Sequence, residues 1–334
     1  MLENKIFSLK TFKIIFILFL ALLSNQALAQ KIKIVQFSDI HLDTINQDRE
    51  VRKFGQSADM YKKAIIKTNA IKPNIVVISG DMVNRPKESE FDAFLNISRG
   101  FGTRYYPSLG NHDVGVGGGL SKEMIINKLN ASCPWLNLTK PYYYSIQGEY
   151  IFIFMDGTTD KQITSTGYFT DEVLNFLDKT LTDYKYKKAI IVQHFPLMPP
   201  FKSSSHEIIN KEDYFNVIEQ HKNVILVLSG HYHASNAVER KNVLYITTPS
   251  MIEYPHAFRY LIVNSDKNNI IISSKLILDD EQNAHEEKQG VIGKLKLGLN
   301  SDNNFTIKLK NNVPQETFTD VIDKLLPVNF QNKN

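Results

Sequence analysis

Five short polar clusters that contain histidine, aspartate or asparagine each follow an apolar run of the sequence. They are Ser38-Asp39-Ile40-His41, Ser79-Gly80-Asp81, Gly110-Asn111-His112-Asp113, Gln193-His194 and Ser229-Gly230-His231-Tyr232-His233. Their side chains offer carboxylate and amide oxygens and imidazole nitrogens, which are ligands for divalent metal ions. A single cluster of this kind is more often a helix cap or a turn. Helix caps and turns do not require histidine, yet four of the five clusters contain it. The whole set therefore favours a metal site.

Seven residues of these clusters are candidate metal ligands, namely Asp39, His41, Asp81, Asn111, His194, His231 and His233. Seven ligands are too many for one tetrahedral ion and suit two ions that share a bridging carboxylate. Two divalent cations, the two aspartates and a bridging hydroxide would leave a net charge of about +1. A site that stays positive after forming its nucleophile suits an anionic phosphate ester. Nitrogen and oxygen ligands leave Mn, Fe, Zn and Co open, as divalent or mixed-valence ions.

The apolar runs that carry these clusters have the composition of buried strands. Eight runs rich in β-branched and aromatic residues occur: Ile32–Phe37, Ile75–Ile78, Tyr105–Leu109, Tyr150–Met155, Ala189–Val192, Val224–Leu228, Val243–Thr247 and Arg259–Val263. Helical patterns lie between several of them, for example at Phe91, Phe94 and Leu95. Strands that alternate with helices predict an α/β fold, in which ligands bind at the carboxyl ends of the strands.

The first 29 residues have the parts of a cleavable signal peptide. Three lysines precede the apolar run Ile14–Leu23, and a small-x-small site ends at Ala29. The run spans ten residues, whereas a membrane-spanning helix needs roughly twenty. We therefore expect an exported protein, periplasmic or secreted, that begins near Gln30 and has no stable membrane span after cleavage. An uncleaved N-terminal anchor is the alternative.

The mature chain is expected to hold one large α/β domain, which carries the five clusters, at residues 30–280 and a C-terminal extension of unknown role at residues 281–334. The stretch Asp279–Gly290, rich in Glu, Gln and Lys, is expected to link them. Within the extension, the pattern predicts a hairpin at Val291–Leu309 and a short helix at Thr317–Leu326. From Lys241 onward strands follow one another, which predicts antiparallel pairing there.

Composition and charge exclude several classes of protein. With 43% hydrophobic residues the chain is not disordered, and its one cysteine excludes a small disulfide-stapled domain. The net charge is only +4 and no run of Lys or Arg occurs, so we expect no nucleic-acid-binding face. The sequence leaves the oligomeric state open.

In their order, the five clusters resemble the motifs D-x-H, GD, GNHD, H and GHxH of the calcineurin-like metallophosphoesterase superfamily. The combination is closest to the cyclic-nucleotide phosphodiesterase-like branch, where Thr248-Pro249-Ser250 has a counterpart after the last motif. Purple acid phosphatases carry a tyrosine three residues after the bridging aspartate, and Asn84 at that place argues against a tyrosinate–iron centre. The resemblance implies a four-layer αββα sandwich, with two mixed β-sheets flanked by helices.

The resemblance also implies a role for each cluster residue. The first metal ion would be bound by Asp39, His41 and His233, the second by Asn111, His194 and His231, and both by the bridging Asp81. His112 would contact the phosphate and protonate the leaving oxygen, and Asp113 would orient its ring. The expected reaction is hydrolysis of a small phosphate ester by a metal-bridging hydroxide, with phosphodiesters favoured over monoesters. A catalytically inactive binding scaffold on the same fold is the alternative.

Three further residues have two interpretations each. Arg85 either reaches a phosphate or lies in solvent. His206 either lines the pocket or lies in an open polar loop. His256 either approaches the metals or lies at the surface.

Overall fold

The computed structural model describes residues 30–45, 47–49, 51–116, 119–279, 290–317 and 320. The predicted signal peptide, nearly all of the predicted linker and most of the predicted C-terminal helix lie outside these ranges. No helix in the described ranges is long and apolar enough to cross a membrane.

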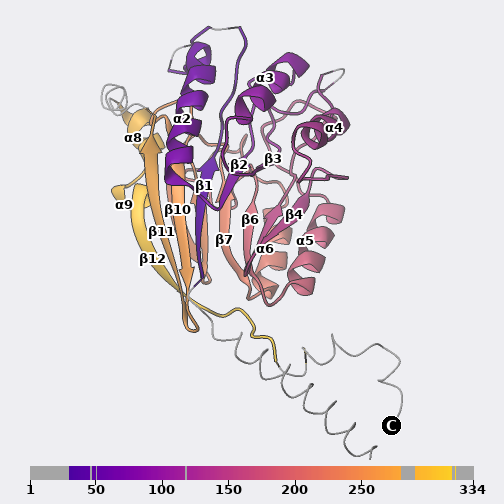
Figure 1. Ribbon diagram of the computed structural model, residues 1–334, viewed down its shortest axis with the longest axis vertical. Helices are drawn as coiled ribbons and strands as arrows, with labels where there is room; N and C mark the ends of the chain where they lie inside the picture. Colours follow the sequence, from indigo (N-terminus) through magenta and orange to yellow (C-terminus); the bar gives the residue numbers. More distant parts are fainter. Residues whose placement is uncertain are drawn as a thin grey trace, which may run out of the picture.

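Two six-stranded sheets form the centre of the described chain (Figure 1). The first sheet has the strand order β12 (Asn304–Lys310), β11 (Asn269–Leu278), β10 (Ala257–Ser265), β1 (Gln30–Phe37), β2 (Ile75–Ser79) and β3 (Tyr105–Ser108). The second has the order β4 (Tyr143–Gln147), β5 (Tyr150–Phe154), β6 (Lys188–Val192), β7 (Val224–Ser229), β9 (Val243–Thr247) and β8 (Asn236–Arg240). Strands β1, β2 and β3 run parallel, as do β5, β6, β7 and β9, and the other neighbours pair antiparallel. Both sheets are therefore mixed.

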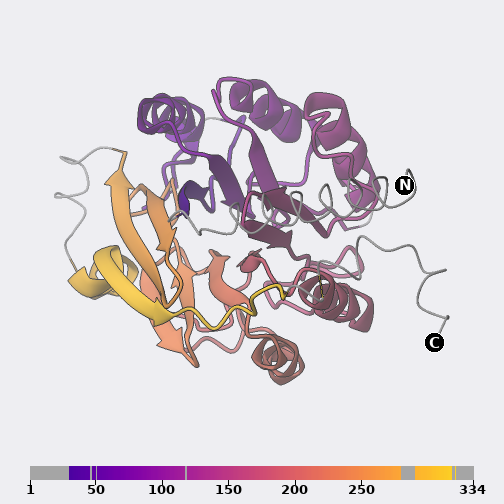
Figure 2. The same ribbon diagram turned by 60° about the horizontal axis from the view of Figure 1, so that its bottom comes forward.

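Helices cover the outer face of each sheet, so the domain has four layers (Figure 2). The first sheet is covered by α2 (Ser57–Ile71), which follows the short helix η1 (Phe54–Gln56), by α3 (Glu88–Ser98) and by α4 (Lys122–Ser132). The second sheet is covered by α5 (Asp171–Asp183) and α6 (Lys211–Gln220). The predicted αββα sandwich is confirmed.

Successive side chains of a central strand point to opposite faces of its sheet and so pack into two different hydrophobic cores. In β1, Ile32 and Ile34 pack between the two sheets, whereas Val35 and Phe37 pack against the helices. Because both faces of such a strand are buried, its sequence is a continuous apolar run. All eight predicted strands are present for this reason.

The prediction of a hairpin at Val291–Leu309 is wrong. The segment 291–310 forms α8 (Val291–Leu297), α9 (Asn300–Asn303) and one strand, β12. Strand β12 pairs antiparallel with β11, with Ile307 opposite Ile272, and completes the edge of the first sheet. Its partner thus comes from the strand before the linker, and local patterning does not reveal a partner so distant in sequence. Residues assigned to the C-terminal extension are therefore part of the first sheet.

Candidate metal centre

Loops at the carboxyl ends of five strands bring the predicted ligands together. The loops after β1, β2, β3, β6 and β7 carry, in chain order, Asp39 and His41, Asp81, Asn111, His194, and His231 and His233. The two aspartates and four histidines are buried, and Asn111 is half-buried. Strands from both sheets thus contribute to one site, at the position expected for a ligand of an α/β fold.

The loops reach the site through tight turns. Five ligand residues have positive backbone φ angles of 44° to 72°: Asp39, His41, Asp81, His231 and His233. Residues other than glycine rarely adopt positive φ angles. Such backbone conformations persist where the surrounding structure enforces them, typically at functional sites. The backbone is therefore shaped to present these side chains.

Two motif glycines make room for the ligands. A Cβ atom at Gly110 would overlap Oδ1 and the backbone nitrogen of Asp81. Gly80 has a φ of +88°, and a Cβ there would lie 2.5 Å from Nδ1 of His194. Both positions exclude any larger residue unless a ligand moves.

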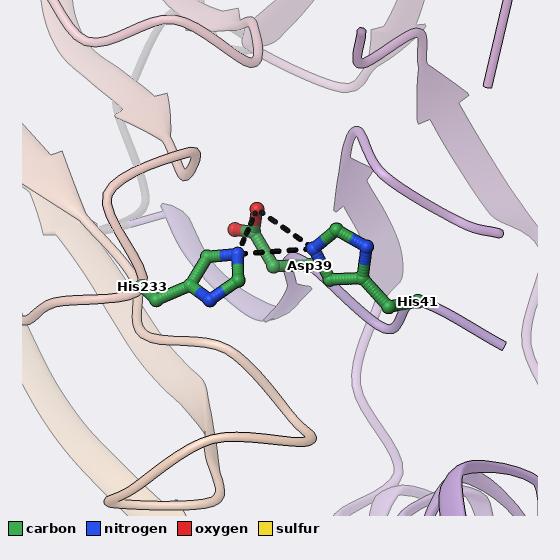
Figure 3. Close-up of side chains that lie close together, drawn as sticks. All are labelled: Asp39, His41 and His233. Carbon is green, nitrogen blue, oxygen red and sulfur yellow. Dashed lines mark hydrogen bonds and ion pairs between the residues drawn. The ribbon is translucent and has the colours of Figure 1, made fainter. Parts of the chain in front are cut away.

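Asp39, His41 and His233 form the first group of converging atoms (Figure 3). The Nε2 atoms of His41 and His233 face each other at 3.0 Å. Oδ1 of Asp39 lies 3.3 Å from Nε2 of His233 and 3.8 Å from Nε2 of His41. Oδ2 of Asp39 accepts the backbone N–H of His231 at 2.9 Å, which fixes the carboxylate.

Asp81, His194 and His231 form the second group. Oδ2 of Asp81 lies 3.2 Å from Nε2 of His194, which lies 3.1 Å from Nδ1 of His231. The same Oδ2 atom is 3.5 Å from Nε2 of His41, which belongs to the first group. One carboxylate oxygen therefore faces both groups, which is the geometry of a bridging ligand.

Hydrogen bonds at the far side of three imidazole rings select their tautomers. Nδ1 of His194 donates to the carbonyl of Ser79 at 2.9 Å, and Nε2 of His231 donates to that of Ser165 at 2.8 Å. Nδ1 of His233 lies 2.6 Å from Oε2 of Glu253, a buried residue that the sequence analysis missed. In each ring the other nitrogen keeps its lone pair toward the site, as metal-binding histidines do.

Burial and charge set the protonation of the site. Burial lowers the pKa values of His41 and His231 well below the usual histidine range, which favours the neutral, ligating form. Burial alone would raise the pKa of Asp81, but the facing His194 and His112 hold it well below its usual range. His41 and His231 are thus neutral imidazoles beside a carboxylate, whereas Asp81 outweighs the effect of burial and raises the pKa of His194 to about 9.

An unpaired amide oxygen shows that these residues fit metal ions. Oδ1 of Asn111 is buried and has no hydrogen-bond partner among the described residues. A buried acceptor without a partner is costly unless a ligand fills the gap. The donor set of nitrogen and oxygen atoms, the facing lone pairs and this oxygen together fit two divalent ions.

His112 lies at the centre, whereas Asp113 has a different role from the one expected. The His112 ring centroid is 4.7 Å from that of His41, and its Nδ1 lies 2.8 Å from the carbonyl oxygen of Asn84. Asp113 accepts the backbone N–H groups of Val83 at 3.1 Å and Gly110 at 2.8 Å. The expectation that Asp113 orients the His112 ring is therefore corrected: Asn84 holds the ring, and Asp113 braces two loops.

The three residues with two interpretations are also placed. Arg85 forms ion pairs with Glu90 and, at 3.1 Å, with Asp43, so it is not a free arginine in solvent. The His206 ring centroid lies 5.1 Å from that of His231, which puts His206 at the site. His256 is buried, so its placement at the surface is wrong.

A cavity of about 240 Å³ adjoins the site on the side of Asn111 and His112. The residues that line it include Thr158 and Thr164, which carry hydroxyl groups, and the apolar Val114. No acidic residue, lysine or arginine is among the residues that line it. The cavity therefore suits an uncharged, partly polar group.

Comparisons with known proteins agree with this geometry. A family model described as calcineurin-like phosphoesterase matches residues 32–235. A protein of Coxiella burnetii named probable cyclic nucleotide phosphodiesterase is 22% identical, over 71% of this chain and 90% of its own length. One of Moraxella catarrhalis with the same designation is 28% identical, over 60% of this chain and 70% of its own. A dimetal phosphatase from Danio rerio shares the fold with a TM-score of 0.59 at 15% identity, over 75% of this chain and 97% of that structure.

Proposed function

We propose that this chain, which belongs to the calcineurin-like phosphoesterase family, is an exported enzyme that hydrolyses phosphodiesters with the help of two metal ions. The observation that carries the proposal is the position of Asp81. Its Oδ2 atom faces His41 at 3.5 Å and His194 at 3.2 Å, between the two groups of ligands. When bound, two divalent ions would lower the pKa of a water between them and offset the charge of the phosphate.

The protein's own residues would handle the leaving group. Water replaces one alcohol on phosphorus, so the departing oxygen needs a proton as its bond to phosphorus breaks. Nδ1 of His112 is engaged by the Asn84 carbonyl, and Nε2 is the nitrogen left to deliver that proton. The half-buried position of His112 between the ligand groups and the cavity supports this role.

The cavity and the relatives both favour a diester as the substrate. A phosphodiester carries two organic groups and one negative charge, and an uncharged cavity beside the site can hold one such group. The cavity lining includes hydroxyl and apolar groups but no cation that would favour a doubly charged monoester. The similar proteins of Coxiella and Moraxella are named as phosphodiesterases. We therefore assign phosphodiesters as the preferred class.

Hydrolysis of bis(p-nitrophenyl) phosphate by the purified Gln30–Asn334 chain tests the activity. We expect turnover with added Mn²⁺, its loss with a chelator, and a lower kcat/KM for p-nitrophenyl phosphate. A higher kcat/KM for the monoester would overturn the diester assignment. A protein that binds metal but hydrolyses neither compound would instead favour the inactive scaffold.

Export is proposed from residues 1–29 alone. Their basic, apolar and small-x-small parts support removal after Ala29. Intact-mass measurement of the protein produced by secreting cells should show a chain that begins at Gln30. A mass that includes Met1 would contradict cleavage and favour the N-terminal anchor.

A further inference from the structure

We propose that Glu253 and Lys296 are positioning residues of the metal centre, through which the C-terminal segment holds the ligand His233 in place. The inference rests on the proposed metal-dependent function. Both residues lie beyond residues 32–235, which match the family model. The residues that match the family model therefore do not include this support.

Glu253 contacts the candidate ligand His233 directly. Oε2 of Glu253 lies 2.6 Å from Nδ1 of His233, and the side chains are only 4% and 7% exposed. A short bond between a carboxylate and an imidazole N–H fixes both the tautomer and the rotation of the ring. The opposite nitrogen, Nε2, is thereby directed at Asp39 and His41, 3.3 Å and 3.0 Å away.

Lys296 compensates the charge of Glu253. A buried carboxylate is costly unless it is paired and hydrogen-bonded. Nζ of Lys296 pairs with Oε1, the oxygen that does not contact His233. Nε of Arg52 lies 3.3 Å from Oε2, but its side chain is 44% exposed, whereas that of Lys296 is 14% exposed. Lys296 is thus the more shielded partner, and it pairs with the oxygen that the imidazole does not use.

The segment that carries Lys296 is attached to the loop of His233 by hydrogen bonds. The carbonyl of Lys296 accepts the backbone N–H of Ser235 at 2.7 Å, two residues after His233. The fully buried Arg259 donates to Oγ of Ser235 at 2.7 Å and to the carbonyl of Asp302 at 2.9 Å. Gly298 has a φ of +68°, and a Cβ there would overlap the Ser235 carbonyl. The segment is therefore closely packed on the loop that carries the ligand.

The position of α8 agrees with this attachment. Helix α8 lies beside the carboxyl end of β11 (Figure 1). The last residue of β11, Leu278, lies opposite the first residue of β10, Ala257. Ala257 follows Glu253 by only four residues. The C-terminal segment thus reaches the edge of the sheet where the ligands gather.

Metal-binding measurements test the proposal without reference to activity. Titration of the metal-free mature chain with Mn²⁺ should show two ions bound by the wild type. We expect Glu253→Ala to weaken one of them by roughly 10–100-fold, the usual effect of losing such a partner, and to leave the other unchanged. Glu253→Gln, which keeps an acceptor but no charge, should weaken the same ion less. Lys296→Met should weaken it in the same direction, and Lys294→Met, an exposed position on the same helix, should have no effect.

Three outcomes would overturn the proposal. Wild-type affinity for both ions in Glu253→Ala and Lys296→Met would show that neither residue positions His233. An equal loss of both ions, with a matching fall in the melting temperature of the metal-free protein, would show a general structural role instead. A wild type that binds no Mn²⁺ or Zn²⁺ would overturn the proposed function itself, and a failure of that kind is distinct from a failure of the variants.

Discussion

The carbonyl oxygen of Asn84 lies 2.8 Å from Nδ1 of His112. A carbonyl only accepts hydrogen bonds, so Nδ1 carries a proton, and a second proton on Nε2, in the imidazolium form, is the one that can pass to the leaving oxygen. Asn84 follows the loop of Asp81, and His112 follows Asn111, so this contact joins the loops of two ligands. A backbone group that substitution cannot remove therefore sets the orientation of the proposed acid.

Replacing His112 with alanine is expected to slow hydrolysis by roughly 10²–10⁴-fold, the usual contribution of a general acid, and to keep both metal ions. A ligand atom of His112 lies within 4.8 Å of those of His41 and Asp81, so metal content must be measured along with kcat.

The matched control is His221→Ala. The His221 ring pairs with Asp178 of α5 at 2.7 Å, on the outer layer of the sandwich, and its loss should change neither quantity. If His112→Ala lost a metal ion, His112 would be a ligand rather than an acid.

Replacing Asp113 with alanine is expected to lower the stability of the protein. The carboxylate accepts the buried N–H groups of Val83 and Gly110, and each unsatisfied group costs about 1–3 kcal/mol. The free energy of unfolding, measured in urea, should fall accordingly, and Asp113→Asn, which keeps one acceptor, should lose less. Unchanged unfolding together with a large fall in kcat would restore the orienting role that the sequence suggested.

Strands buried on both faces could be predicted from the sequence, whereas half-buried edge strands could not. The central strands contain uninterrupted apolar residues because each faces two cores, as the buried β5 and β7 do. The edge strands β4 and β8 are short and only half-buried, so they lack a continuous apolar run. Strand β12 was missed as a single strand because its partner, β11, precedes the linker.

The candidate metal ligands could be predicted because their residue types follow directly after recognisable strands. Glu253 follows β9, which ends at Thr247 at the same edge of the second sheet, so its place after a strand was a usable signal. Lys296 offered no such signal, because only the docking of α8 brings it to Glu253. The role of Asp113 was misassigned because adjacency to His112 in the sequence does not reveal which way a carboxylate points.

Asp81→Ala is expected to lose both metal ions, because Oδ2 of Asp81 faces both groups of ligands. Metal content after dialysis, measured by inductively coupled plasma mass spectrometry, should fall from two ions to fewer than one per chain. Asp156→Asn is the matched control, since Asp156 is also buried but pairs with Lys122 at 2.6 Å. Retention of one tightly bound ion in Asp81→Ala would contradict a bridging role.

Gly110→Ala is expected to weaken metal binding without removing any ligand. The added Cβ would overlap Oδ1 and the backbone nitrogen of Asp81, so the carboxylate must shift or the β3 loop must move. Overpacking of this kind costs roughly 1–3 kcal/mol, and a displaced Oδ2 can no longer face both groups. Mn²⁺ titration should show weaker metal binding, and urea unfolding should show a lower free energy of unfolding.

Gly100→Ala serves as the control for the added methyl group, because the nearest atom to its Cβ would be the Ile97 carbonyl oxygen at 3.2 Å, in an exposed turn after α3. We expect this variant to bind both ions as the wild type does. If Gly110→Ala did so too, the close packing of Gly110 on Asp81 would not determine the position of the bridging carboxylate.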